Sequence, residues 1–476
     1  MGDAKGGGGR RALRRRWLML GLFAATSAAN AAHWLQFAII AGVAQRFYGV
    51  GPAAINWTSM VFMAAYVPLV FPASWITDKK GLRVAVALGA GLTALGGWLK
   101  ALGSWPERFA VAFAGQALVG AAQMFTLGAP ARLAALWFPP GQVATACALG
   151  VFGNQVGIAV GFVVPPAVVS AEGAPEDVTR ELLWLHVALA AAPTLLFLLI
   201  LFLFEAAPPS APAPEVEGGL GPEQLPLRPP APLKEPLPAA NGGAGGAARL
   251  SFGASLRALA RNRDFALLWC AYGLNVGVFY AVSTLLSQML LAHFPGAEED
   301  AGRVGLAMVV AGVAGSVAGG LALDRWRRYK RTTLLVYALA LAGLLAFAFA
   351  LRSASLAAVY ASAALLGFFT TGYLGVGYEY AAALTPGVAE STSSGMLNAA
   401  SEVMGIALTL AAGELLEYAG DRLTNLALTA VLALGFLLSA LVRDGDARAR
   451  GAAGGGGGRG DAVEPVPQEP PEKFLS

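Results

Sequence analysis

Polar and aromatic side chains that interrupt long apolar stretches are the residues of this sequence best suited to chemistry. A polar group inside a membrane-spanning segment is costly, so one that persists there is a candidate for binding a ligand. The candidates are Asn30, His33, Trp34 and Gln36; Gln116 and Gln123; Asn154 and Gln155; Asn275, Tyr280, Ser283 and Ser287; Tyr373, Tyr378, Glu379 and Tyr380; and Asn398 and Glu402. Because Asn30 and Trp34 are four residues apart, a continuous helix would place them on one face.

Trp34 and Tyr280 lie near the middle of their apolar stretches, whereas aromatic residues of membrane proteins normally collect at the two interfaces. If the two rings face each other, they form a box that attracts a quaternary ammonium group. The carboxylates Glu379 and Glu402 would add a negative potential that favours a cation. These residues predict a site for an organic cation.

Other kinds of site find less support. The amides of Gln116, Asn154, Gln155, Asn275 and Asn398 are explained equally well as hydrogen bonds between helices, and both interpretations stay open. We see no basic residue well inside an apolar stretch other than Arg132, so an anionic ligand would have little to hold it.

The sequence predicts neither an enzyme nor a metal site. The histidines and cysteines are too scattered for a metal motif or a disulfide framework, and no nucleophile is paired with a base; the residues concerned are His33, His186, His293, Cys147 and Cys270. No cofactor is expected.

Composition indicates the elements that must position these side chains. Of 476 residues, 56% are hydrophobic and 13% are charged, against roughly 25% charged in soluble domains. This excludes a soluble enzyme, a disordered protein and a nucleic-acid binder. A membrane-spanning helix needs about 20 apolar residues. We predict an all-α membrane protein with twelve spans, over residues 17–44, 55–76, 82–102, 109–135, 143–169, 182–204, 264–293, 303–323, 332–351, 355–384, 391–416 and 423–442.

The twelve spans form two halves of six, over residues 17–205 and 264–442. Residues 206–263 between them hold eleven of the 28 prolines and a glycine-rich run, a composition that favours a flexible linker. The polar ends, 1–16 and 443–476, are expected to be disordered.

Basic residues predict the orientation, because Lys and Arg favour cytoplasmic loops. They cluster at the N-terminus, after the second span, at the end of the linker and after the eighth span, whereas the loops after the fifth and seventh spans are acidic. All basic segments fall on one side of a twelve-span arrangement. Both termini are therefore expected to be cytoplasmic.

This plan of six spans, a linker and six spans resembles the major facilitator superfamily. That superfamily carries an Asp and basic residues after the second span. Here that loop reads Asp78-Lys-Lys-Gly-Leu-Arg83, and the loop after the eighth span contains Asp324-Arg325. Copies in corresponding places of both halves indicate an internal duplication. We predict that these charges form a latch between helices that breaks and reforms as the halves rock.

Longer stretches resemble one family, the feline leukaemia virus subgroup C receptor-related proteins (FLVCR). The resemblance covers about residues 12–445. Its most specific stretches are Phe47-Tyr-Gly-Val50, Gly153-Asn-Gln-Val-Gly-Ile-Ala-Val-Gly-Phe162, Phe279-Tyr280, Ser283-Thr-Leu-Leu286 and Ala301-Gly-Arg-Val-Gly305.

The resemblance implies a facilitative transporter of choline and ethanolamine that works by alternating access, with haem export as an older assignment in the family. It implies that Trp34 and Tyr280 hold the trimethylammonium group and that Gln123 and Asn30 complete the pocket. Glu402 stands where the family has Gln, and His33 also departs from a family Gln.

Three alternatives remain beside choline and ethanolamine transport. Haem export would need an axial ligand and basic groups for two propionates. A proton-coupled symporter would use Glu379 or Glu402, and a receptor without transport activity would leave the polar residues unused. We expect a monomeric multi-pass protein whose partners are a small molecule and the lipid bilayer, with no nucleic acid. The resemblance suggests the plasma membrane.

Overall fold

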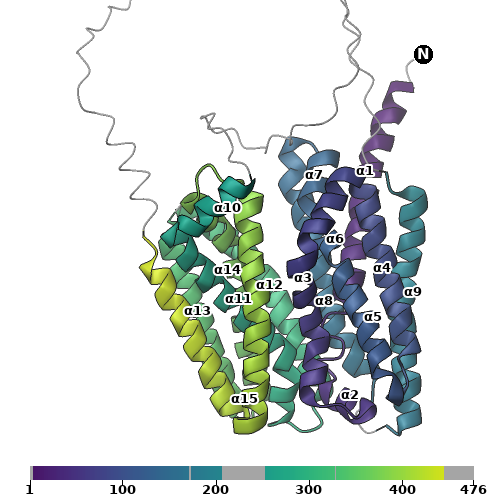
Figure 1. Cartoon of the computed structure of the whole chain (residues 1–476), viewed down its shortest axis with the longest axis vertical. Coiled ribbons are helices and arrows are strands. Elements are labelled where there is room, and N and C mark those ends of the chain that lie inside the picture. The colour runs from purple at the N-terminus through teal and green to yellow at the C-terminus, as the bar shows by residue number, and fades with distance from the viewer. Residues whose placement is uncertain (1–3, 171–172, 206–251, 327, 444–476) are drawn as a thin grey trace, which may run out of the picture.

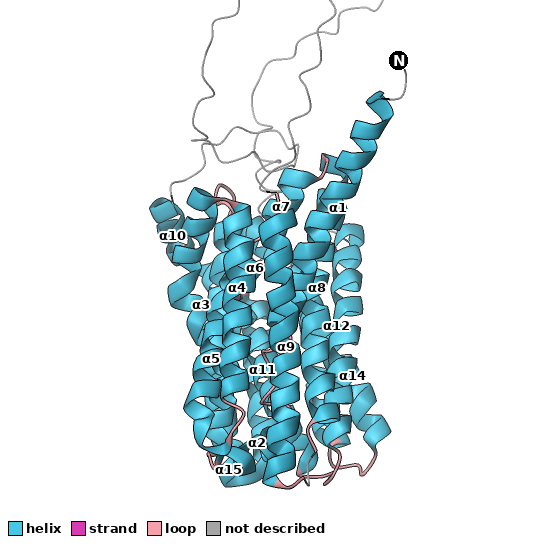
Figure 2. Cartoon of the chain, turned by 90° about the vertical axis from the view of Figure 1, so that its right-hand side faces the viewer, coloured by secondary structure: helices cyan, strands magenta, loops and turns pink. Residues whose placement is uncertain are grey.

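The computed structural model describes residues 4–170, 173–205, 252–326 and 328–443, and every regular element in these ranges is a helix (Figures 1 and 2). The elements before the undescribed segment 206–251 are α1 (Ala4–Ala31), α2 (Ala41–Tyr48), α3 (Pro52–Lys80), α4 (Leu82–Leu102), α5 (Phe109–Ala122), α6 (Met124–Leu127), α7 (Pro130–Trp137), α8 (Val143–Val168) and α9 (Pro175–Leu203). Those after it are α10 (Phe252–Arg261), α11 (Arg263–Leu291), α12 (Glu298–Trp326), α13 (Tyr329–Ala350), α14 (Leu356–Leu384) and α15 (Glu390–Leu441).

The predicted spans correspond to these helices. Within the described ranges, ten helical stretches are long and apolar enough to cross a membrane. The longest, α15, is two helices that meet at Gly420, whose φ of 77° is a conformation that other residues rarely adopt. The predicted fourth span is divided into α5, α6 and α7. The predicted first span corresponds to α1, a non-helical stretch of turns and bends over residues 32–40, and α2.

Two predicted boundaries differ from the structure. Residues 4–16, expected to be disordered, form the first turns of α1. Arg, Ala and Leu of residues 10–16 favour a helix, whereas the four glycines at 6–9 do not. Residues 252–261, expected to end the linker, form α10, whose apolar and basic residues fall on opposite faces. The rest of the expected linker, 206–251, and the C-terminal segment 444–476 lie outside the described residues.

The helices form two groups that stand side by side, α1–α9 and α10–α15 (Figure 1). The start of α1 and α10 lie at one end of the bundle, which we call the terminal end, and α2 and the bend of α15 lie at the other, which we call the bend end (Figure 1). The two groups meet mainly through α3 against α15 and α8 against α12. A site between the groups is therefore framed by α3, α11, α15 and the non-helical stretch 32–40.

Candidate functional site

The interruption of the first span places Trp34 at the interface between the two groups. Helix α1 ends at Ala31, and residues 32–40 are turns and bends rather than helix. The prediction that Asn30 and Trp34 share a helical face is therefore wrong, because the helix has ended before Trp34. Because Trp34 is not part of a helix, helical geometry does not set the direction of its side chain. The indole is buried, with 9% of its surface exposed.

Trp34 contacts Tyr280 of α11. The ring centroids are 5.4 Å apart and the ring planes make an angle of 77°, an edge-to-face arrangement. We call these two residues the aromatic pair. Gly405 of α15 makes room for it, because a Cβ at that position would lie 2.7 Å from the Tyr280 ring and 2.9 Å from the Met63 sulfur. The pair thus joins residues from both halves of the chain.

Glu402 brings a carboxylate to the aromatic pair. It is buried, 7% exposed, and its side chain lies beside Tyr280. One turn earlier on α15, the Asn398 amide oxygen accepts a hydrogen bond from the Tyr378 hydroxyl. A buried carboxylate flanked by aromatic rings attracts a cation, because the ring faces and the carboxylate are all negative.

Two further residues implied by the resemblance do not hydrogen-bond the aromatic pair or Glu402. The Asn30 amide nitrogen donates to the Thr93 hydroxyl (2.9 Å) and to the Val119 carbonyl (3.0 Å), so it joins α1 to α4 and α5. Gln123, at the end of α5, is half-buried, and its amide oxygen is enclosed and has no hydrogen-bond partner among the described residues. Asn30 therefore supports the helices, while Gln123 keeps an acceptor available.

The other intramembrane carboxylate, Glu379 of α14, is exposed, unlike Glu402. Of the two carboxylates, Glu402 is the buried one.

Lys100 is the buried residue that the sequence analysis missed. It lies in the last turn of α4 and is fully buried. Its amine donates to Gln36 Oε1 (2.7 Å) and Gln116 Oε1 (2.9 Å) and shares a hydrogen bond with His33 Nδ1. Lys100 lies at the end of its span, so the sequence analysis did not count it as an intramembrane basic residue, although its side chain is buried. A lysine near a span end normally extends to the interface, and only the residues around Lys100 reveal that it turns inward.

Two of the charges predicted to form a latch have partners on other helices. Asp78 at the end of α3 forms a salt bridge with Arg132 of α7. The Arg83 guanidinium donates to the Leu201 carbonyl at the end of α9 (2.7 Å). Arg325 is exposed at the end of α12, and the side chain of Asp324 lies outside what the structure describes. An ion pair between two helices is thus present at the terminal end of the first group.

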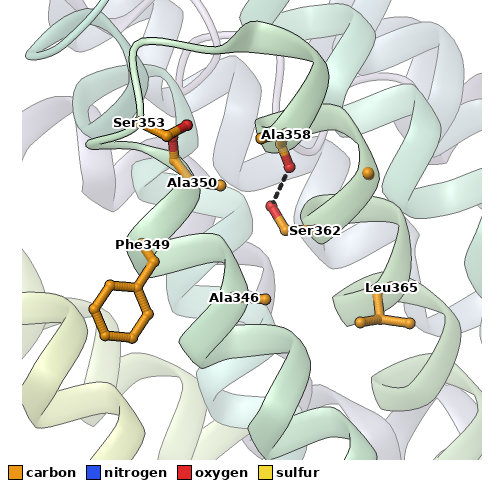
Figure 3. A pocket seen from close by; sticks show the side chains of 8 residues that line it. Ala346, Phe349, Ala350, Ser353, Ala358, Ser362 and Leu365 are labelled. Carbon is orange, nitrogen blue, oxygen red and sulfur yellow. Dashed lines mark hydrogen bonds between the residues drawn. The ribbon is translucent and has the colours of Figure 1, made fainter.

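An open groove of about 500 Å³ lies elsewhere, between α13 and α14 (Figure 3). Its walls are mostly apolar, and the Ser362 hydroxyl in it donates to the Ala358 carbonyl (Figure 3). None of the residues lining it belongs to the site around the aromatic pair. We assign it no function.

Two groups of membrane-spanning helices with a buried aromatic and carboxylate site between them define a polytopic transporter of small molecules. The model of the Major Facilitator Superfamily matches residues 18–361. Among solved structures, a bacterial homologue of the human lysosomal transporter Spinster, in an inward-facing conformation, has a TM-score of 0.64 at 14% identity and covers 90% of this chain and 97% of its own. The fucose transporter FucP, in an outward conformation, has a TM-score of 0.55 at 16% identity and covers 90% of this chain and 100% of its own.

Sequence relatives narrow the family. The choline/ethanolamine transporter flvcr2b of Danio rerio is 41% identical over 91% of this chain and 84% of its own. The choline/ethanolamine transporter FLVCR1 of Felis catus is 39% identical over 90% of this chain and 73% of its own. The MFS-type transporter C09D4.1 of Caenorhabditis elegans is 43% identical over 90% of this chain and 70% of its own. The chain therefore belongs to the major facilitator superfamily and, within it, to the FLVCR family.

Proposed function

We propose that this chain transports choline and ethanolamine across a membrane by facilitated diffusion. The observation that carries the proposal is the aromatic pair, Trp34 and Tyr280, with the buried side chain of Glu402 beside Tyr280. The relatives named choline/ethanolamine transporters match about nine-tenths of the chain, which supports the same substrate class.

The two substrates would use the site differently. A trimethylammonium group has no N–H to donate, so it depends on the faces of Trp34 and Tyr280. The primary ammonium of ethanolamine donates hydrogen bonds, and the buried carboxylate of Glu402 offers it an acceptor. Both substrates carry a hydroxyl, for which the unpaired amide oxygen of Gln123 is the proposed acceptor.

Alternating access would come from rocking of the two helix groups about this site. Hydrogen bonds between the groups include Ser59 with Thr284 (2.7 Å) and Gln288 with Asn56 (2.8 Å), which lie toward the bend end. The Asp78–Arg132 salt bridge lies at the terminal end, where we propose that it stabilises one arrangement of α3 and α7. The basic loops favour a cytoplasmic terminal end, with both termini inside the cell. We propose a monomer, and the family resemblance is the reason for proposing the plasma membrane.

One alternative keeps a specific observation in its favour. Glu402 is a buried carboxylate in the middle of a span, and such groups carry protons in many transporters. Haem transport is less well supported. His33 does have a basic neighbour, but the amine of Lys100 is already hydrogen-bonded to three buried side chains, those of His33, Gln36 and Gln116, rather than being available for a propionate.

Uptake of radiolabelled choline into cells that express the chain, with and without a protonophore, tests the proposal. We expect saturable uptake that ethanolamine competes for and that survives the protonophore. Cells with the Trp34→Ala/Tyr280→Ala variant, matched for the amount of protein in the membrane, are the control and should show background uptake. Uptake that collapses with the proton gradient would favour symport through Glu402, and no uptake by well-expressed protein would contradict the proposal.

A further inference from the structure

The break in the first span has no local cause. Sharp interruptions of a helix normally occur at Pro, Gly or an inserted polar group. Residues 32–40 read Ala-His-Trp-Leu-Gln-Phe-Ala-Ile-Ile and contain neither Pro nor Gly. An apolar segment of this kind would continue α1 unless other parts of the molecule held it open, since backbone groups freed inside a membrane must find partners within the protein.

Lys100 and Gln116 supply those partners. The Lys100 side-chain nitrogen is hydrogen-bonded to three groups, the side chains of His33 and Gln36 in the break and that of Gln116 on α5. Gln116 in turn donates through its amide nitrogen to the backbone carbonyl of His33 (2.7 Å) and to that of Thr58 on α3 (3.1 Å). The break is thus fixed to three helices of the first group.

These contacts hold the chain on both sides of Trp34. His33 precedes the indole and Gln36 follows it by two residues, and both side chains are fully buried. Lys100 and Gln116 are fully buried as well, so water does not compete for the hydrogen bonds. The position of Trp34 against Tyr280 therefore depends on a group that touches neither ring.

We propose that Lys100 is a positioning residue for Trp34: through His33, Gln36 and Gln116 it holds residues 32–40 out of a helix, so that the indole faces Tyr280. We call the hydrogen bonds of Lys100 and Gln116 to residues 32–40 the clamp. The role of Trp34 in binding choline rests on the proposed function, whereas the clamp does not. The partners of the amine in the described residues are neutral acceptors and the face of Phe37, 5.7 Å away, with no carboxylate among them.

Hydrogen–deuterium exchange of the purified full chain tests the clamp without any substrate. Lys100→Met keeps the length of the side chain and removes its donors, and we expect amide exchange within residues 32–40 to become at least about tenfold faster, with α8 and α9 unchanged. Ser104→Ala is the matched control. Ser104 is equally buried and bonds His186 and the Lys100 carbonyl, but not the break, so exchange at 32–40 should stay as in the wild type.

A second variant decides the test if Lys100→Met does not fold. Gln36→Met leaves Lys100 in place and removes one acceptor from the break itself. It should speed exchange at 32–40 in the same direction. Unchanged exchange at 32–40 in the folded variants, or an increase spread evenly over the first group of helices, would overturn the proposal.

The Kd for choline is a second readout. It would not change if Lys100 only stabilised the fold without positioning Trp34. By calorimetry on purified protein, Lys100→Met should raise the Kd for choline at least about tenfold, but less than about threefold when Trp34 is already Phe, because both changes act on the same contact. Independent, multiplying effects would overturn the proposal. If the wild type binds no choline, the proposed function fails, and the exchange experiment still decides the clamp.

Discussion

Replacing Trp34 by Leu removes the ring face while keeping an apolar side chain in the site. A cation on a desolvated ring face gains about 2 kcal/mol, and about 1.4 kcal/mol corresponds to a factor of ten in Kd. The indole is 9% exposed and packs edge-to-face on Tyr280, so the free energy for a desolvated ring face applies to Trp34. We therefore expect the Kd for choline to rise about thirtyfold, and Trp34→Phe, with a weaker ring, to fall between Leu and the wild type.

Calorimetric titration of choline into purified protein measures this change directly. Trp184→Leu is the matched control, because Trp184 is 66% exposed on α9 and should leave the Kd unaltered. Ethanolamine provides a second comparison: its ammonium can use Glu402, so Trp34→Leu should weaken it less than choline. A wild-type protein that binds choline and a Trp34→Leu variant within threefold of it would refute the aromatic-pair model.

Three other changes test separate parts of the site. Glu402→Gln should preserve choline uptake and its resistance to a protonophore, while weakening ethanolamine about tenfold through loss of a charged acceptor; loss of choline uptake would favour proton coupling. Gly405→Ala should raise the KM for choline because its Cβ would meet the aromatic pair, whereas Gly395→Ala on the same helix, with nothing within 4 Å, should not; equal effects would exclude the steric explanation. Asp78→Asn should lower the maximal rate and spare the KM, as measured by initial rates, with the surface variant Asp177→Asn unaffected; an altered KM alone would speak against a conformational role.

The membrane-spanning helices could be predicted because apolar length is a property of each segment by itself. The predicted span 82–102 coincides with α4, and span 143–169 with α8 to within one residue. The bend of α15 was also anticipated as a boundary between two spans, since polar residues and Gly420 interrupt the apolar run. Neither the helical start of α1 nor α10 could be separated from the tail and linker by hydrophobicity, because both are polar.

The aromatic pair could be predicted because two aromatic residues stood away from the interfaces, in different halves. The break that presents Trp34 could not, since its cause lies in Lys100 and Gln116, more than sixty residues along the chain. The same separation hid the inward direction of Lys100. Local patterns thus identify which side chains matter, whereas long-range hydrogen bonds decide where the backbone carries them.

Choline flux in proteoliposomes that contain only the purified chain tests the central claim most directly. With no pH or sodium gradient, the account predicts saturable choline movement down its own gradient, which reverses direction when the choline gradient is reversed and is abolished in the Trp34→Ala/Tyr280→Ala variant. Flux that requires an imposed proton gradient, or no flux from correctly inserted protein, would contradict it.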